Sequence, residues 1–205
     1  MEYLILGFVT SFSLILAIGP QNIFVIEQGL KKQHIFLVCS VCTISDTILI
    51  FSGIFLFHYF SQYFNQILEF VFNLLLIIFL IHFIFSKIKT HYSEVNFQNN
   101  VSKISRLDIF AKTLGFTYLN PHVYSDTVLI LGNFSKNYLL NQKLAFGIGA
   151  SLASLIFFFA LGYLSNYLSK YANDKKIWQV INIFIITFMS FLVLFILKEM
   201  IIKIL

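Results

Sequence analysis

The chain has 205 residues, of which 59% are hydrophobic and only 11% are charged, and its mean hydropathy is +0.85. A soluble domain carries about 25% charged residues, so this chain has too few polar side chains to cover a water-exposed surface. The composition therefore excludes an ordinary soluble protein and predicts a single transmembrane domain, residues 1–205. The net charge of +5 does not indicate nucleic-acid binding, because the lysines lie between apolar runs, as loop charges do in membrane proteins. The expected large partner is the lipid bilayer.

Six apolar segments are long enough to cross a bilayer, which takes about 20 helical residues. They cover residues 3–26, 36–57, 67–86, 108–132, 144–164 and 177–198, and the fourth is the most polar. A hydrophilic linker at about 89–107 separates a first half, about 1–88, from a second half, about 108–205. The sequence thus predicts an all-α integral membrane protein with three helices in each half. Because three is an odd number, the halves would be inserted as inverted repeats.

The basic residues predict the orientation of these spans, since cytoplasmic loops are rich in lysine and arginine. Most of them would share one side of the membrane: Lys31, Lys32, Lys87, Lys89, Lys103, Arg106, Lys112, Lys170, Lys175 and Lys176. With that side in the cytoplasm and six spans, both termini would lie outside the cell.

The chain contains only two prolines, Pro20 in the first segment and Pro121 in the fourth. Each removes a backbone hydrogen bond, and its ring clashes with the carbonyl group one turn back. The first and fourth helices are therefore predicted to be broken at Pro20 and Pro121. Breaks at corresponding positions of inverted repeats indicate a transporter's binding site. The alternative is two unrelated kinks, because proline is fairly common in membrane helices.

Each break is expected to start a new half-helix, because proline suits the first helical position and Asn120 is a favourable N-cap residue. The free N–H groups and the dipole of such a helix start favour an anion, and a carboxylate is the obvious small guest. The residues at the two breaks that are predicted to bind substrate are Gly19, Pro20, Gln21, Asn22, Asn120, Pro121 and His122.

Two acidic residues lie inside predicted spans: Asp46 at the centre of the second, and Asp126 five residues after Pro121. An acid at this depth costs several kcal/mol and marks a functional site by default. The alternative is a structural acid that pairs with a basic residue, but the second span contains none. The two helix starts could bind a carboxylate, and the two acids could bind ammonium groups. Together they predict a free amino acid with a cationic side chain as substrate.

Three strings carry a family resemblance: GPQNIFVIEQG (19–29), CTISD (42–46) and YLNPHVYSDTVLILG (118–132). They resemble the LysE/ArgO basic amino acid exporters of the LysE/RhtB superfamily. The resemblance implies a multi-pass protein of the prokaryotic plasma (inner) membrane that exports L-lysine or L-arginine, driven by the proton gradient or the membrane potential. It implies that the path is lined by Gly19, Pro20, Gln21, Asn22, Asp46, Asn120, Pro121 and Asp126. Ser125 departs from the family pattern, where a bulkier apolar residue is expected, and leaves the substrate choice open.

Other readings stay open at this point. The chain could export another amino acid of the same superfamily. It could export a metal or another cation, since Cys39, Cys42 and Asp46 share one helix face and soft metals favour such ligands, although this gives the prolines no role. An intramembrane aspartyl protease would use Asp46 and Asp126 as a proton-sharing pair, but its Gly-x-Gly-Asp string is missing. No enzymatic activity and no cofactor are expected, and a homodimer is left open beside a monomer.

Overall fold

A computed structural model describes residues 1–63, 66–92, 105–171 and 175–204, and every regular element within these ranges is helical. The α-helices are α1 (Glu2–Ile15), α2 (Pro20–Leu30), α3 (Ile35–Tyr63), α4 (Gln66–Tyr92), α5 (Arg106–Tyr118), α6 (Pro121–Tyr124), α7 (Leu131–Ser135), α8 (Leu140–Leu168) and α9 (Lys175–Ile204). A π-helical segment, η1 (Ser125–Ile130), joins α6 to α7, and a 3-10 turn, η2 (Ser169–Tyr171), follows α8.

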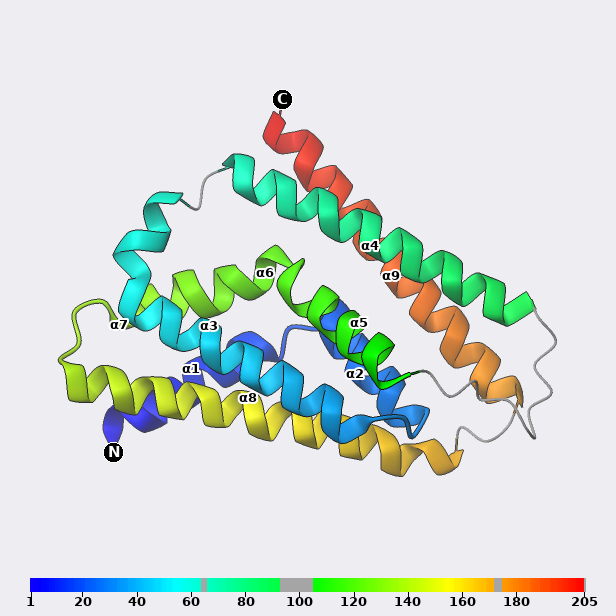
Figure 1. Ribbon diagram of the computed structural model, residues 1–205, viewed down its shortest axis with the longest axis horizontal. Coiled ribbons are helices and arrows are strands. Elements are labelled where there is room, and N and C mark those ends of the chain that lie inside the picture. Colours follow the sequence, from blue (N-terminus) through cyan, green and yellow to red (C-terminus); the bar gives the residue numbers. More distant parts are fainter. Residues whose placement is uncertain (64–65, 93–104, 172–174, 205) are drawn as a thin grey trace.

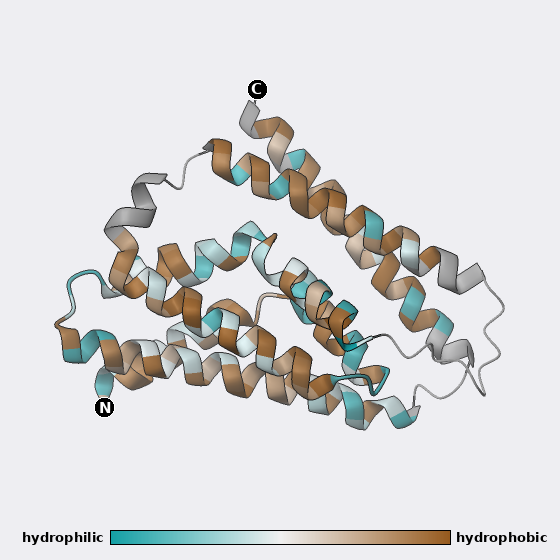
Figure 2. Cartoon of the chain, viewed as in Figure 1, coloured by the Kyte–Doolittle hydropathy of each residue, from teal (hydrophilic) through white to brown (hydrophobic). Residues whose placement is uncertain are grey.

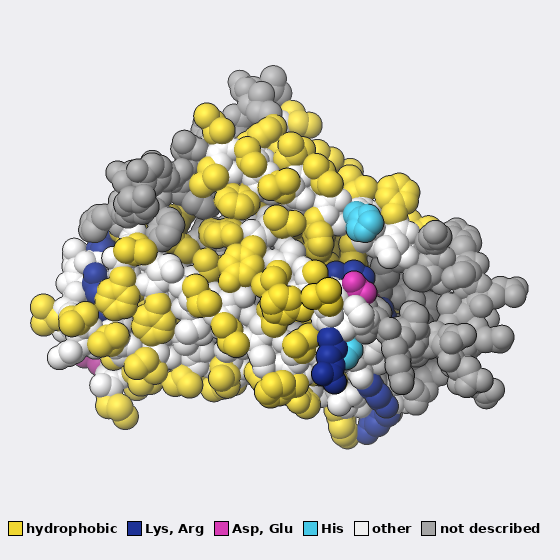
Figure 3. Space-filling view, in the orientation of Figure 1, with side chains coloured by type: hydrophobic (Ala, Val, Ile, Leu, Met, Phe, Trp, Pro, Cys, Tyr) yellow, Lys and Arg dark blue, Asp and Glu magenta, His cyan; other side chains and the backbone are white. Residues whose placement is uncertain are grey.

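The long helices form two groups with the broken helices between them (Figure 1). Helices α3 and α8 pack together on one side, and α1 lies against α8. On the other side, α4 packs along α9. Apolar residues dominate the lengths of the helices (Figure 2), and on the face shown in Figure 3 charged side chains appear at the left end and in a group right of the middle. This distribution suits a protein whose middle lies in hydrocarbon.

Within the described ranges, four helices are long and apolar enough to cross a membrane, over Ile35–Phe57, Ile67–Ser86, Leu140–Leu168 and Gln179–Ile202. Helices α1 and α2 together make a fifth candidate, bent by 83°. The prediction of an all-α protein with several membrane spans is therefore confirmed, but the count of six is not. The fourth predicted span, 108–132, is divided among α5, α6, η1 and α7, and each piece is too short to cross alone. The centre of the predicted linker, 93–104, lies outside the described residues.

Glycines let several helices touch backbone to backbone. A Cβ atom on Gly149 of α8 would overlap the carbonyl oxygen of Leu4 in α1. A Cβ atom on Gly53 of α3 would lie 2.6 Å from Val128 Cα and 2.7 Å from Thr127 O, both in η1. Small residues commonly permit such close helix contacts in membranes. The second contact sets how closely η1 approaches α3.

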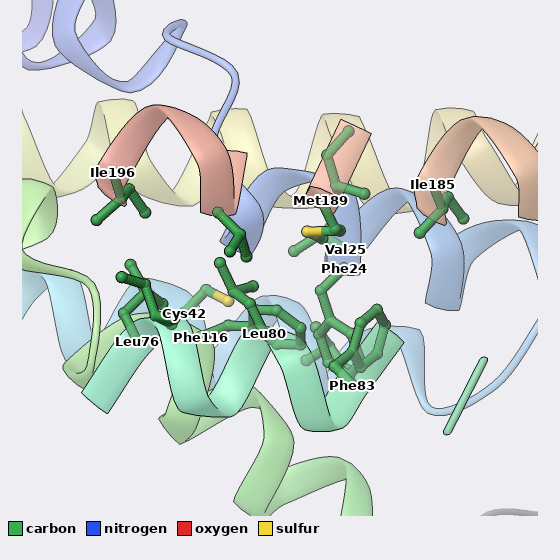
Figure 4. Packing of buried hydrophobic residues seen from close by; sticks show 14 of the residues in the cluster. Phe24, Val25, Cys42, Leu76, Leu80, Phe83, Phe116, Ile185, Met189 and Ile196 are labelled. Carbon is green, nitrogen blue, oxygen red and sulfur yellow. The ribbon is translucent and has the colours of Figure 1, made fainter. Parts of the chain in front are cut away.

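The larger buried cluster of apolar residues joins α4 and α9 to α2, α3 and α5 (Figure 4). Four of its rings contact one another, and we call them the phenylalanine cluster: Phe24, Phe79, Phe83 and Phe116. Phe24 of α2 stacks on Phe116 of α5 with ring centroids 4.7 Å apart, and Phe79 and Phe83 meet Phe116 edge-on at 4.7 and 5.0 Å. Both Phe24 and Phe116 are fully buried. The cluster thus ties the two half-helices α2 and α5 together.

Candidate functional site

The first helix break lies where the sequence predicts it. Helix α1 ends at Ile15, Gly19 adopts an extended conformation with φ −122° and ψ −179°, and α2 starts at Pro20. The side chain of Asn22 holds the break, because its Nδ2 donates to the carbonyl oxygens of Ile15 (3.2 Å) and Ala17 (3.0 Å). Backbone groups released by a break need such partners inside a membrane. Asn22 therefore satisfies the end of α1.

The second break differs from the first in its capping. Helix α5 ends at Tyr118, and α6 starts at Pro121 after the N-cap residue Asn120. The Oδ1 atom of Asn120 accepts a hydrogen bond from the backbone N–H of His122 at 3.1 Å, as the sequence predicts for this residue. Helix α6 is only four residues long before the π-helical η1 begins. The expected anion site at this break is thus partly occupied by the chain's own side chain, which makes the two breaks unequal.

The breaks meet at a cavity of about 370 Å³, a size typical of small-ligand sites. Eight of the nine residues predicted to bind substrate line it: Gly19, Pro20, Gln21, Asn22, Asp46, Asn120, His122 and Asp126. The ninth, Pro121, is buried but does not line the cavity. The structure therefore brings these residues together, while their contact with a substrate stays a prediction.

The two acids approach the cavity from different elements. Asp46 lies on α3 with 5% of its surface exposed, and its Oδ2 accepts a hydrogen bond from Ser154 Oγ of α8 at 2.9 Å. Asp126 lies on η1 and lines the same cavity as His122 and Asp46. π-Helical turns are frequent at functional sites. Sequence reasoning missed Ser154, and the only signal was its position among the small residues of α8.

On the side of α2 and α5 the cavity ends at packed apolar residues, and we call this side its closed end. Helix α2 contributes only its first three residues to the lining, and α5 contributes none. One turn further along α2, Phe24 starts the phenylalanine cluster. Apolar residues of α1 and α9, such as Ile15 and Ile196, form other walls. Such walls suit the aliphatic part of a long side chain, with polar groups placed at the breaks and at the acids.

The metal-exporter interpretation finds no support at this site. Among the described residues, no group of three or more histidine, cysteine, aspartate or glutamate side chains could hold a metal ion. Cys39 and Cys42 are buried thiols within the large apolar cluster, and Cys39 Sγ donates to the carbonyl oxygen of Phe158 at 3.2 Å. Cys39 therefore packs between α3 and α8, and Cys42 is buried in the same apolar cluster.

Comparison with known proteins identifies the family. Residues 12–199 match the model of the LysE type translocators. Over 188 residues, the chain is 35% identical to the arginine exporter protein ArgO of Pectobacterium atrosepticum, a match that covers 87% of this chain and 88% of the relative. The arginine exporter protein ArgO of Salmonella paratyphi A is 33% identical over 188 residues, covering 90% and 88%. No solved structure is significantly similar to the chain. With its two helix breaks and two acids around one cavity, the chain belongs to the LysE type translocator family, whose members are transporters rather than enzymes.

Proposed function

We propose that this protein exports basic L-amino acids, arginine or lysine, from the cytoplasm. The observation that carries the proposal is the cavity in which Asp46 and Asp126 lie with the start of α2. Carboxylates attract ammonium and guanidinium groups, whereas a helix N-terminus attracts a carboxylate. A basic amino acid carries both kinds of group. The arginine exporters that resemble the chain over most of its length support the same substrate class.

Part of the proposal is a fold of six spans in two inverted repeats, with α1–α2 as the first span and α5–α7 as the fourth. The helix contacts support it. Helix α1 of the first half packs on α8 of the second, and α5 of the second half packs on α3 of the first. The counterparts α3 and α8 pack on each other, as do α4 and α9. An axis relating two inverted halves would produce such an exchange.

We place the protein in the inner membrane of a prokaryote with both termini outside. Basic residues support this orientation: Lys31 caps the end of α2, Arg106 starts α5, and Lys170 follows α8. Basic side chains gather at that end of the molecule in Figure 3. The positive-inside rule assigns it to the cytoplasm. On this assignment the closed end of the cavity faces the cytoplasm.

Coupling to protons also belongs to the proposal. Moving a cation out against an inside-negative potential costs about 2.3 kcal/mol per charge for each 100 mV. Exchange of one cationic amino acid for one entering proton moves no net charge and removes this cost. Asp46 and Asp126 are carboxylates that can hold either cation. A carrier that moved the amino acid alone would be slowed by the potential.

The test uses purified protein in liposomes loaded with labelled arginine, lysine or leucine. We expect efflux of arginine or lysine that exceeds that of leucine and is accelerated by a proton gradient directed inward. Asp46→Asn should abolish this efflux. The matched control is Asp108→Asn, which removes an exposed acid of α5 outside the cavity and should leave efflux intact. Preferred leucine efflux, or full efflux by Asp46→Asn, would refute the proposal. Cross-linking in the same liposomes tests whether two copies assemble.

A further inference from the structure

The second helix break lacks one hydrogen bond of a continuous helix, and two side chains replace it. In an unbroken helix the N–H group of His122 would donate to the carbonyl oxygen of Tyr118, four residues back. Here that N–H group donates to Asn120 Oδ1 at 3.1 Å. The carbonyl oxygen of Tyr118 accepts instead from the hydroxyl group of Tyr124 at 2.9 Å. Each half of the missing bond therefore has a side-chain partner.

Tyr124 does at the second break what Asn22 does at the first. Each follows a proline closely and donates to a carbonyl group at the end of the preceding helix. Carbonyl groups released inside a membrane need such donors. Tyr124 itself does not line the cavity, whereas Val123 before it and Asp126 after it do. Its hydroxyl group therefore affects the cavity through its neighbours.

Helix α4 contacts the chain on both sides of this break. The ring of Tyr124 stacks on Phe72 of α4, with ring centroids 5.0 Å apart and an angle of 26° between the planes. Further along α4, Phe79 and Phe83 contact Phe116 of α5, which precedes the break. Phe72 and Phe79 are about 10 Å apart along one face of this continuous helix (Figure 1). Because α4 contacts both pieces, it fixes the angle between them.

We infer that Tyr124 is a positioning residue that joins α4 to the second break and thereby sets the position of Asp126. Its hydroxyl group holds the end of α5, its ring holds α4, and the backbone continues into η1, which carries Asp126. A displacement of α4, with α9 packed along it, therefore moves Asp126 relative to α3 and Asp46. The inference rests on the proposed function in that Asp126 takes a cationic group of the substrate. It goes further because it names the residue and the helix on which that acid depends.

Thiol labelling measures the state of the break without any ligand. Val123→Cys places a thiol on the cavity wall beside Tyr124, and Ile18→Cys places one at the first break. The native Cys39 and Cys42 are fully buried and should react little. A buried carbonyl group that loses its donor shifts a conformational equilibrium by about 5-fold to 150-fold. Tyr124→Phe keeps the ring but removes the donor, so it should change the labelling rate at position 123 by at least about 5-fold and leave that at position 18 unchanged.

A second variant tests the contribution of α4. Phe72→Leu removes the stacked ring and leaves the hydroxyl group in place, and it should change labelling at position 123 by about 2-fold to 12-fold, as expected for an aromatic pair. Two matched controls should label like wild type. Tyr138→Phe removes a hydroxyl group from a ring that packs against Tyr3, and Phe184→Leu removes a ring that stacks on Phe188 of its own helix.

Binding of labelled arginine to purified protein measures the consequence for the site. Tyr124→Phe should weaken it by about 5-fold or more, because Asp126 is displaced. Unchanged labelling at position 123, or an equal change at positions 123 and 18, overturns the inference. A response to Tyr124→Phe without one to Phe72→Leu overturns the role of α4, and altered labelling with unchanged arginine binding overturns the positioning of Asp126. If the wild type binds no arginine, the proposed function fails, whereas labelling still decides whether Tyr124 holds the break.

Discussion

Gly53→Ala should move the two acids of the cavity relative to each other. A Cβ atom at Gly53 would meet three backbone atoms of η1 at 2.6–2.7 Å. Backbone cannot rotate away as a side chain can, so η1 must retreat from α3 by about 0.8 Å to restore an ordinary contact near 3.4 Å. A gap of about 0.5–1 Å already forfeits a quarter to a half of the dispersion energy of the atoms that line it.

The expected magnitude follows from two opposing terms. Overpacking typically costs about 1–3 kcal/mol, whereas alanine is better than glycine within a helix by about 1 kcal/mol. Gly147→Ala of α8 is the matched control, since the three atoms nearest to a Cβ there belong to the side-chain ends of Phe51 and Ile54, at 2.8–3.0 Å. The same helical gain applies to both variants. We therefore expect Gly53→Ala to be less stable than Gly147→Ala by about 1–3 kcal/mol.

Unfolding by denaturant in detergent micelles measures this difference, and arginine efflux from liposomes measures its functional effect. Asp126 moves with η1, so Gly53→Ala should also reduce efflux more than Gly147→Ala does. Equal stability of the two variants would show that the contact between α3 and η1 is not tight. Unchanged efflux despite reduced stability would show that the position of η1 does not affect substrate binding.

Three further variants test other contacts of the site. Ser154→Ala removes the hydrogen bond to Asp46, and a hydrogen bond to a charged group contributes about 1.5–3 kcal/mol. This variant should weaken arginine binding, whereas Ser154→Thr keeps the hydroxyl group and should not. Equal arginine binding by both variants would contradict a positioning role for Ser154. Asn22→Ala leaves two carbonyl groups of the first break without a donor, at about 1–3 kcal/mol each, and a thermal unfolding temperature equal to that of wild type would contradict this role. Phe24→Ala removes the ring that stacks on Phe116 and should lower the free energy of unfolding by about 3–5 kcal/mol. It should also allow passive leakage of arginine from liposomes. Liposomes that do not leak would show that the closure of the cavity does not depend on this pair of rings.

The helix breaks and the acids could be predicted because local chemistry decides them. Proline cannot continue a helix wherever it lies, so Pro20 and Pro121 mark the starts of α2 and α6 regardless of packing. Asp46 had to face protein or water, since a carboxylate in lipid is costly. Both inferences need only the sequence and the bilayer, and the cavity gathers the residues accordingly.

The difference in side-chain hydrogen bonding between the two breaks could not be predicted, because it depends on where the side chains point. Asn22 lies two residues after Pro20 and Asn120 directly before Pro121, and the first satisfies the preceding helix while the second caps the following one. The bond between Ser154 and Asp46 joins residues 108 apart in the chain. Glu27, near the end of a span in the sequence, is buried and paired with Lys31. The bond between Ser154 and Asp46 and the burial of Glu27 follow from tertiary packing, which no local pattern contains.

In a carrier that works by alternating access, the phenylalanine cluster would set an energetic threshold on the conformational change. Any conformation that opens the cavity at the α2–α5 end must part Phe24 from Phe116, which stack at 4.7 Å. A phenylalanine ring buries at least about 150 Å², so wetting one ring fully costs about 4 kcal/mol or more at about 25 cal/mol per Å². Such a carrier, when empty, therefore stays closed at this end. It does not admit solutes and ions whose binding does not offset the free energy of opening. Only a ligand that binds the opened form more tightly by a comparable amount populates it, which makes turnover conditional on substrate.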